Sequence, residues 1–292
     1  MKVHLVDGTY ELFRAYFAVP SVSAPDGREI GAVRGLVQTM LALLRQSDVT
    51  HVAVAFDSVI ESFRNDMFSG YKSSDGVAAE LLGQFELAES AVRSLGVVVW
   101  PMVEFEADDA LASAARSFAS APGVEQVVVC SPDKDLAQTV DGDRIVCLDR
   151  KRNAMLDEPG VRAKFGVGPA SIPDYLALVG DAADGIPGIP KWGSKTSAAV
   201  LSHYGHLEQI PEEVSDWEVN VRGAKGAAES LALRREDSLF YRDLATLRLD
   251  VPIGETLAEL EWRGVPRQRF REFCVDQGLS GLADRPHRWD DR

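Results

Sequence analysis

The sequence predicts an α/β protein in which a parallel-rich central sheet is flanked by helices. Over the first two-thirds of the chain, short runs rich in β-branched residues alternate with amphipathic stretches of helical period. Such alternation is typical of strands joined by helical crossovers. The strand runs are mostly apolar, as expected for a parallel sheet that helices cover on both faces.

The elements of this core can be placed in order. The predicted strands are residues 2–6, 51–56, 96–100, 126–130 and 144–148. The helical pattern recurs between them at residues 31–45, 78–94 and 107–118. Residues 62–80 have no clean period and contain the turn signal Ser73-Ser74-Asp75-Gly76, which is typical of a mobile surface connection.

After residue 158 the strand pattern stops, and helical segments follow that are separated by a loop rich in glycine and proline. The predicted helices are residues 160–165, 172–179, 194–204 and 223–234. We therefore expect an α/β core at 1–158 and a mainly helical subdomain at 159–292.

Composition restricts the class of protein. Hydrophobic residues make up 46% and charged residues 26% of the 292 residues, which is typical of a globular protein. No apolar run approaches the roughly 20 residues that span a membrane, and Asp7 comes too early for a secretory signal. The three cysteines lie in unrelated contexts, which predicts neither disulfides nor a zinc site. We expect a cytoplasmic protein.

Acidic residues follow three of the predicted strands. Asp7 and Asp57 follow the first two, and Asp133 and Asp135 come just after the fourth. In an open parallel sheet, residues beyond the carboxyl ends of the strands line a common crevice. Further acids come in groups with a spacing of three. They are Glu106, Asp108 and Asp109 at the start of a helix, and Asp181 and Asp184 beside the Gly/Pro loop.

Each of these acids taken alone is ordinary, since aspartates often form turns and acids often cap helices. Gathered in one crevice, however, like charges repel unless cations lie between them. Carboxylates without histidine or cysteine favour Mg²⁺ or Mn²⁺ over zinc, and two or more such ions suit hydrolysis of a phosphodiester.

The net charge of −14 argues against a nucleic-acid partner at first sight. Nine of the 45 acids belong to the candidate metal set, however, so the remaining 36 exceed the 31 bases by only five. The acidity is therefore compatible with a metal centre in a protein that binds nucleic acid.

The Gly/Pro loop is a candidate phosphate site. It enters a helix whose first turn holds Ser194, Lys195 and Thr196. Backbone N–H groups at a helix start, together with Ser, Thr and Lys side chains, bind phosphate. The alternative is an ordinary turn with a serine cap, and the spacing is not that of a Walker loop.

A set of short motifs occurs in a fixed order over residues 1 to about 250. They are Asp7-Gly8, Arg14-Ala15, Ala55-Phe56-Asp57, Phe63-Arg64, Tyr71-Lys72, Glu106-Ala107-Asp108-Asp109, Ser131-Pro132-Asp133-Lys134-Asp135, Gly180-Asp181, Asp184-Gly185-Ile186-Pro187-Gly188 and Gly193-Ser194-Lys195-Thr196. The set resembles the 5′-nuclease family of flap endonucleases and 5′→3′ exonucleases, which includes the amino-terminal domain of bacterial DNA polymerase I. The resemblance implies a PIN/resolvase-like core with a helical arch at about 62–95 and a helix–three-turn–helix at about 180–205.

The resemblance also implies roles for individual residues. All nine acids would hold two or more Mg²⁺ or Mn²⁺ ions. Lys72 and Arg64 would be catalytic residues that face the scissile phosphate, with Lys72 stabilising the transition state. The implied DNA-binding residues are Arg14, Tyr71, Lys191, Gly193, Ser194, Lys195 and Thr196, and in some members the loop carbonyls hold K⁺. Tyr10 and Tyr16 would lie near the 5′ end.

The implied activity is two-metal hydrolysis of 5′-flap, nicked or 5′-ended duplex DNA in replication and repair, by a monomer without a membrane partner. The sequence departs from the family pattern at a few positions. Asp75 stands where the arch usually has Arg, Ala183 and Gly185 replace Ser and Asn, and Lys191-Trp192 replaces Gly-Ile.

Two other functions remain open from the residues alone. Asp75 motivates a structure-specific DNA-binding protein with weak or lost catalysis, because a carboxylate there would repel a phosphate. A small-molecule phosphatase with an aspartate nucleophile is the third hypothesis, in which the arch and the loop would have no purpose.

Overall fold

The structure, a computed structural model, describes residues 1–290 and divides the chain into two compact units. Unit 1 comprises Met1–Ser62, Ser74–Ser131 and the chain from Leu249 onward. Unit 2 comprises Phe63–Ser73 and Pro132–Arg248. This division differs from the boundary predicted at residue 158, because the last predicted strand of the core belongs to unit 2 and the last helix of the chain belongs to unit 1.

Unit 1 is built on a parallel sheet with the strand order β3-β2-β1-β4. The strands are β1 (Lys2–Asp7), β2 (His51–Asp57), β3 (Val98–Met102) and β4 (Gln126–Cys130). Leu5 of β1 is opposite Ala53 on one side and Val129 on the other, and all three are fully buried. The predicted mixed α/β fold with a mostly parallel central sheet is confirmed.

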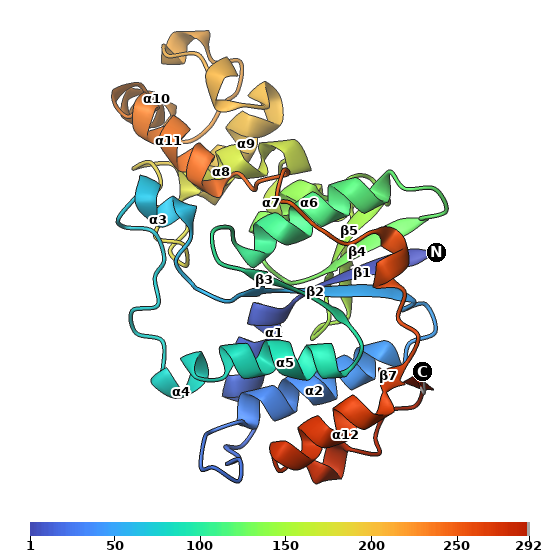
Figure 1. The fold of residues 1–292 in the computed structure, drawn as a ribbon. Coiled ribbons are helices and arrows are strands. Elements are labelled where there is room, and N and C mark those ends of the chain that lie inside the picture. Colours follow the sequence, from blue (N-terminus) through green and yellow to red (C-terminus); the bar gives the residue numbers. More distant parts are fainter. Residues whose placement is uncertain (291–292) are drawn as a thin grey trace. The chain divides into compact units, whose positions relative to one another are not determined.

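Helices cover both faces of this sheet. Figure 1 shows α6 on one face and α1, α2 and α5 on the other. Their bounds are α1 Gly8–Ala18, α2 Gly31–Leu44, α5 Phe85–Ser94 and α6 Ala107–Ala119. The face of α6 that meets the sheet is rich in alanine, and Ala110 and Ala114 are fully buried, so the helix approaches the strands closely.

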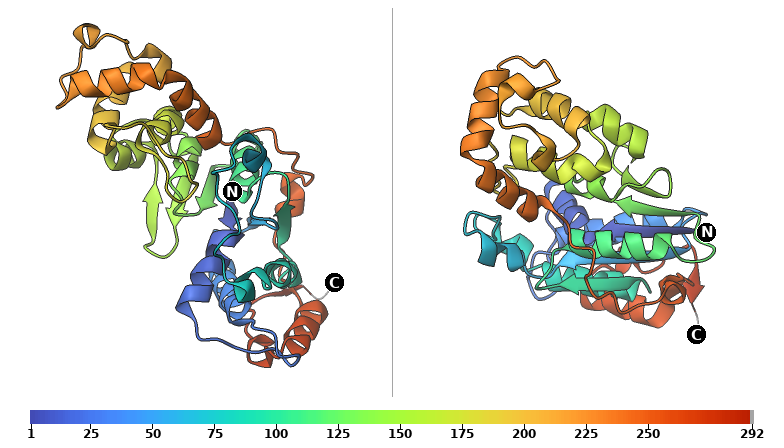
Figure 2. Two further views of the ribbon diagram at one scale, coloured as in Figure 1. Left: turned by 90° about the vertical axis from the view of Figure 1, so that its left-hand side faces the viewer. Right: turned by 90° about the horizontal axis from the view of Figure 1, so that it is seen from above.

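The remaining elements of unit 1 are short. Helix α12 (Arg267–Asp276) packs against α5, and Figure 2 shows it, coloured red, beside the blue and teal helices. The single helix predicted at 78–94 is wrong in one respect, because Gly83 ends α4 (Ala79–Leu82) before α5 begins. Strands do not disappear after residue 158, since β7 (Val265–Pro266) pairs with β8 (Trp289–Asp290).

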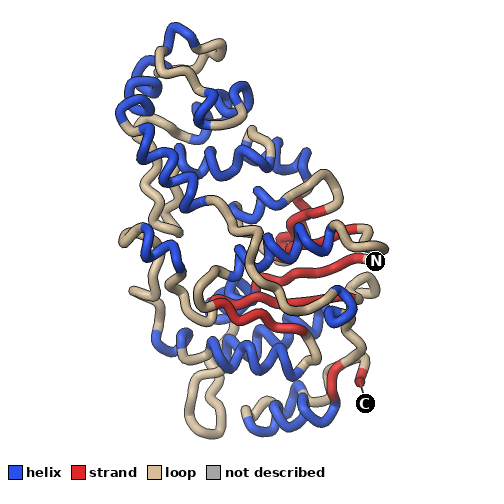
Figure 3. Tube along the Cα trace, turned by 45° about the horizontal axis from the view of Figure 1, so that its top comes forward, coloured by secondary structure: helices blue, strands red, loops and turns tan. Residues whose placement is uncertain are grey.

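Unit 2 is mainly helical. Residues 160–245 are drawn as helices and loops in Figure 3. The helices are α3 (Phe63–Met67), α7 (Glu158–Phe165), α8 (Ile172–Val179), α9 (Ser194–Tyr204), α10 (Ala224–Leu233) and α11 (Arg235–Ala245). An antiparallel hairpin of β5 (Ile145–Asp149) and β6 (Ala154–Leu156) completes it.

The early segment Phe63–Ser73 is held in unit 2 by aromatic contacts. The ring of Phe68 lies 6.0 Å from that of Phe240 and 6.4 Å from that of Tyr241, both on α11. Helix α11 in turn packs along α8. A part of the chain from before β3 is thus built into a unit made largely of residues after 131.

Within residues 1–290, no helix combines the length and the apolar character needed to cross a bilayer.

Candidate metal centre

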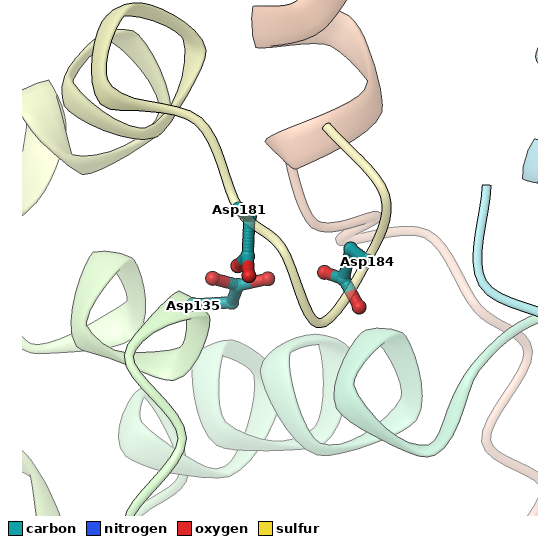
Figure 4. Close-up of side chains that lie close together, drawn as sticks. All are labelled: Asp135, Asp181 and Asp184. Atoms are coloured by element: carbon teal, nitrogen blue, oxygen red, sulfur yellow. The ribbon is translucent and has the colours of Figure 1, made fainter. Parts of the chain in front are cut away.

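Three buried carboxylates lie close together in unit 2. Asp135, Asp181 and Asp184 each offer an oxygen, and these oxygens lie within 4.8 Å of one another. Figure 4 shows the carboxylates of Asp135 and Asp181 facing each other, with Asp184 farther along the same turn as Asp181. Carboxylate oxygens at this spacing can share a divalent cation.

Local structure explains why these acids meet. Asp135 begins a 3₁₀ helix, η1 (Asp135–Thr139), which packs against α8. The chain leaves α8 into a tight turn whose base is closed by two backbone hydrogen bonds of 2.8 Å between Asp181 and Ile186. The N–H of Ala183 donates to Oδ1 of Asp181 at 3.0 Å, which orients that carboxylate.

Only glycine fits one position of this turn. Gly185 has φ +77°, a conformation that other residues rarely adopt, and a Cβ there would lie 2.1 Å from the carbonyl oxygen of Gly70. The close approach lets the N–H of Lys72 donate to the carbonyl of Asp184 at 3.0 Å. The departure at Gly185 therefore allows the segment 70–72 to pack directly on the turn that carries Asp184.

The cluster carries uncompensated negative charge. Burial, together with the charges of Asp133 and Asp184, raises the pKa of Asp135 well above its usual value. Burial also raises the pKa of Asp133, and the charge of Asp184 adds to that effect. Among the described residues, Oδ1 of Asp135 has no hydrogen-bond partner. A buried oxygen without a donor is what a metal ligand leaves when no ion is bound.

Two lysines contact the cluster. Nζ of Lys134 lies 2.6 Å from Oδ1 of Asp181, and Nζ of Lys72 lies 3.4 Å from Oδ1 of Asp184. Burial lowers the pKa of Lys134, but the hydrogen bond and the charge of Asp181 outweigh burial, so its pKa is raised. Each ammonium group therefore compensates one carboxylate.

The other predicted metal ligands lie outside this cluster. Asp133 precedes it in unit 2, where its Oδ1 accepts the N–H of Asp135 at 3.1 Å. The remaining five acids belong to unit 1: Asp7, Asp57, Glu106, Asp108 and Asp109.

The acids at the strand ends of unit 1 accept hydrogen bonds from the fold itself. Asp7 ends β1 and caps α1, because it accepts the N–H of Tyr10 and the hydroxyl of Ser131, both at 2.8 Å. Asp57 ends β2 and accepts the N–H of Ala107 at 2.8 Å. The same side chains thus serve as caps and remain candidate ligands.

The acids at the start of α6 are held in a similar way. Oδ2 of Asp109 accepts the N–H of Glu106 at 3.0 Å, and Oε1 of Glu106 accepts the hydroxyl of Ser62 at 2.8 Å. Asp108 lies in the first turn of the helix and is half-buried.

The structure corrects the role expected for Arg64. Its side chain is 1% exposed, and its guanidinium donates to the carbonyl oxygens of Leu244 at 2.8 Å and Thr246 at 3.0 Å. These carbonyls lie in the last turn of α11 and at its C-cap, Thr246, where carbonyls have no partner within the helix and need other donors. Arg64 therefore ties α3 to the end of α11, a structural role that the sequence did not indicate.

Two other predicted site residues, Lys72 and Arg14, contact side chains of their own unit. Lys72 lies 5.7 Å above the ring of Tyr71, which is buried. Arg14 pairs with the buried Glu11 and donates to the hydroxyl of Thr39 at 3.1 Å. Both basic side chains are thus held in place by neighbours in their own unit.

The entry to α9 is exposed. Gly193, not Ser194, occupies the N-cap position, so the alternative of a serine cap is wrong. Lys191, Gly193, Ser194 and Lys195 are exposed, and Thr196 is half-buried. Beneath them Trp192 is buried and its indole N–H donates to the carbonyl of Ala227 at 2.9 Å. The tryptophan at the Ile position therefore anchors this loop, while Lys191 stays exposed.

Sequence reasoning assigned no role to Lys134. Its position between Asp133 and Asp135 is a weak signal, because a lysine flanked by acids is usually a surface feature. The ion pair with Asp181, 47 positions later, depends on the fold.

Two family models match consecutive parts of the chain. One, described as a 5′-3′ exonuclease N-terminal resolvase-like domain, matches residues 2–166. The other, described as a 5′-3′ exonuclease C-terminal SAM fold, matches residues 167–268. Together they cover the acids of both units.

Curated relatives agree with the family models. DNA polymerase I of Pseudomonas aeruginosa is 36% identical over 292 residues, which covers 95% of this chain and 31% of that protein. A 5′-3′ exonuclease of Buchnera aphidicola subsp. Schizaphis graminum is 30% identical over 259 residues, which covers 88% of this chain and 89% of that protein. The chain spans about a third of the length of the DNA polymerase I relatives.

The fold also has solved counterparts. The flap endonuclease of bacteriophage T5, solved in a complex with DNA and metal ions, has a TM-score of 0.68 at 16% identity, covering 97% of this chain and 100% of that one. This likeness is one of fold.

Proposed function

Because the chain belongs to the 5′-3′ exonuclease family, we propose that it is a divalent-metal-dependent 5′-nuclease. Its substrates are 5′-flap, nicked or 5′-ended duplex DNA, and its cofactor is Mg²⁺ or Mn²⁺. It acts as a monomer in replication and repair. The observation that carries the proposal is the buried group of Asp135, Asp181 and Asp184.

The donors of this group fit a hard cation. All are carboxylate oxygens, one of them has no hydrogen-bond partner among the described residues, and no sulfur or imidazole accompanies them in the group. We propose that Asp133 and the five acids of unit 1 are further ligands, since they occupy the matching positions of the family motifs. Bound divalent ions would lower the pKa of the attacking water and stabilise the leaving oxygen.

The residues of this chain position the phosphate. Lys72 is the proposed catalytic residue, because its ammonium lies beside Asp184 and its backbone is fixed to the same turn. A positive charge held there stabilises the charge that develops on the phosphate oxygens. Arg64 is not part of this proposal, because its guanidinium is used by backbone carbonyls.

The entry to α9 is the proposed grip on the DNA backbone. Exposed N–H groups at a helix start attract phosphate, and Lys195 adds a charge beside them. The loop carbonyls before the helix could hold K⁺, as in some members of the family. Arg14, Tyr71, Lys191, Gly193, Ser194 and Thr196 complete the proposed DNA-binding set.

The proposal is tested by single-turnover cleavage of a 5′-labelled flap and a nicked duplex, with Mg²⁺, with Mn²⁺ and with a chelator. We expect short labelled products from both substrates only when the metal is present. Tight DNA binding without turnover at saturating Mn²⁺ would show instead a structure-specific binding protein. Hydrolysis of a small phosphate ester without DNA cleavage would favour a phosphatase.

A further inference from the structure

We propose that Lys134 is a resident counter-cation of the metal centre, which a divalent ion has to displace from Asp181 in order to bind. This inference rests on the proposed function, because it concerns the same three acids. It assigns to Lys134 a positioning role that sets the affinity for the metal.

The contact that carries the inference is the ion pair of Lys134 with Asp181. The ammonium nitrogen lies 2.6 Å from Oδ1 of Asp181, which also accepts the N–H of Ala183 at 3.0 Å. The side chain of Asp181 is 2% exposed and that of Lys134 is 36% exposed. The lysine thus occupies, from its partly exposed position, an oxygen that a metal ion would need.

Charge repulsion should end the contact between Lys134 and Asp181 when a divalent ion binds. Asp135, Asp181 and Asp184 carry −3 when ionised, the neighbouring Asp133 adds −1, and the ammonium groups of Lys72 and Lys134 reduce the sum to −2. A divalent ion bound to Asp181 would bring the sum to zero, and it would lie close to the ammonium of Lys134 because both use the same carboxylate. Repulsion between the ion and the nearest ammonium group favours the release of one lysine.

Lys134 is the lysine that can leave at the smaller cost. Lys72 is fixed through its backbone, since its N–H donates to Asp184 and its carbonyl accepts the amide of Asn65 at 2.9 Å. The ammonium of Lys134 contacts the cluster at the end of a long side chain that is already partly in water. Its release needs rotation of that side chain and no movement of the turn.

Lys134 therefore has opposite effects on the metal-free and the metal-bound protein. In the metal-free protein Lys134 compensates a buried carboxylate and stabilises unit 2. When the metal is present, the same ammonium group competes with it and weakens binding. Loss of the ammonium should therefore strengthen metal binding and weaken the metal-free protein.

The test uses the full chain and Mn²⁺, whose free concentration electron paramagnetic resonance reports directly. Lys134→Met keeps the length of the side chain and removes the charge, and it should bind Mn²⁺ about tenfold more tightly. Lys134→Arg keeps the charge and should bind like the wild type. Lys151→Met, which removes the same charge from an exposed turn of unit 2, is the matched control and should leave the affinity unchanged.

A double-mutant cycle isolates the pair. In an Asp181→Asn background, Lys134→Met should bring no gain in Mn²⁺ affinity, because the contested oxygen no longer carries charge. Metal-free Lys134→Met should also melt at a lower temperature than Lys151→Met, and saturating Mn²⁺ should remove the difference.

The possible failures can be told apart. If the wild type binds Mn²⁺ and cleaves DNA but Lys134→Met binds Mn²⁺ no more tightly, this inference is overturned and the proposed function stands. The same holds if the gain persists in the Asp181→Asn background. If the wild type binds no Mn²⁺, the proposed function fails and the inference fails with it.

Discussion

The acids of unit 1 and those of unit 2 are compensated in different ways. In unit 1, Asp7 and Asp57 accept hydrogen bonds from backbone N–H groups at the starts of α1 and α6. In unit 2, Asp181 and Asp184 are compensated by ammonium groups, and one oxygen of Asp135 has no partner among the described residues. Dipoles of the fold contribute to the stability of the first set, and ammonium groups contribute to the stability of the second.

This difference separates two tasks that a metal centre has to perform. Strand ends and helix starts hold the unit 1 carboxylates in place whether or not an ion is present. The unit 2 carboxylates lie on a turn and a 3₁₀ helix, and their repulsion stores free energy that a cation releases. We therefore expect the effect of metal on stability to arise mainly in unit 2.

The largest expected effect is that of Asp135→Asn on cleavage. An amide binds a divalent cation far more weakly than a carboxylate, so the single-turnover rate should fall about a thousandfold or more at saturating Mg²⁺. Quenched-flow cleavage of a 5′-labelled flap measures it, with circular dichroism as the control for folding. A rate within a few-fold of the wild type would remove Asp135 from the centre.

Gly185→Ala should destabilise the turn that carries Asp181 and Asp184. A methyl group there would lie against the carbonyl of Gly70, in a backbone conformation that disfavours alanine. We expect the free energy of unfolding to fall by about 3 kcal/mol. Urea denaturation measures it, and Gly193→Ala, where a Cβ meets nothing within 4 Å, is the control. Equal effects of the two changes would contradict the packing described for Gly185.

Charge removal should change stability in opposite directions in the two sets. In the metal-free protein, Asp135→Asn relieves repulsion and should raise the free energy of unfolding by about 1 kcal/mol. Asp7→Asn weakens the bonds from Tyr10 and Ser131 and should lower it by about 1 kcal/mol. Urea denaturation in chelator tests both, and changes of the same sign would remove the contrast between the units.

The gain from Asp135→Asn should depend on pH. The pKa of Asp135 is raised above its ordinary value near 3.8, so the folded metal-free protein binds a proton more tightly than the unfolded chain. This contribution is fully present below the ordinary value and is lost as pH rises through the raised one. The difference in thermal stability between variant and wild type should therefore shrink as pH falls through that window. A difference that does not change with pH would contradict the shift.

The smallest expected effect concerns Lys191, which has φ +71° in the loop that follows the unit 2 acids. Lys191→Gly relieves this conformation but adds freedom to the unfolded chain, so the net gain in stability should be about 0.5 kcal/mol. Thermal denaturation measures it, and Lys191→Ala, which keeps the Cβ, should bring no such gain. A loss of stability would show that the lysine stem, which packs on Gly226, matters more than the backbone.

The sheet could be predicted from sequence because its strands are apolar runs. The predicted strands at residues 2–6, 51–56 and 126–130 match β1, β2 and β4 within a residue. Helix α1 was not predicted, because its start at Gly8 follows the strand directly and its capping residue, Asp7, was read as a turn or metal ligand. Strand β6 has only three residues and depends on pairing with β5.

The candidate site was predictable only in its residue types. The spacing of Asp181 and Asp184 marks an acidic turn, but their distance from Asp135 follows from the packing of η1 on α8. The burial of Arg64 was not predictable, since its acceptors lie 180 and 182 positions later. Local patterns carry no information on contacts that the tertiary structure alone creates.

The buried guanidinium of Arg64 also bears on the order in which this protein can be made. Its acceptor at Leu244 is 180 positions further along the chain, and ribosomes add about 5 to 20 residues each second. Leu244 is therefore synthesised roughly 10 to 40 seconds after Arg64. During that interval the segment around Phe63 cannot adopt its final packing, because the part of unit 2 that buries the guanidinium has not been made. Unit 2 can reach its final form only when translation has passed α11.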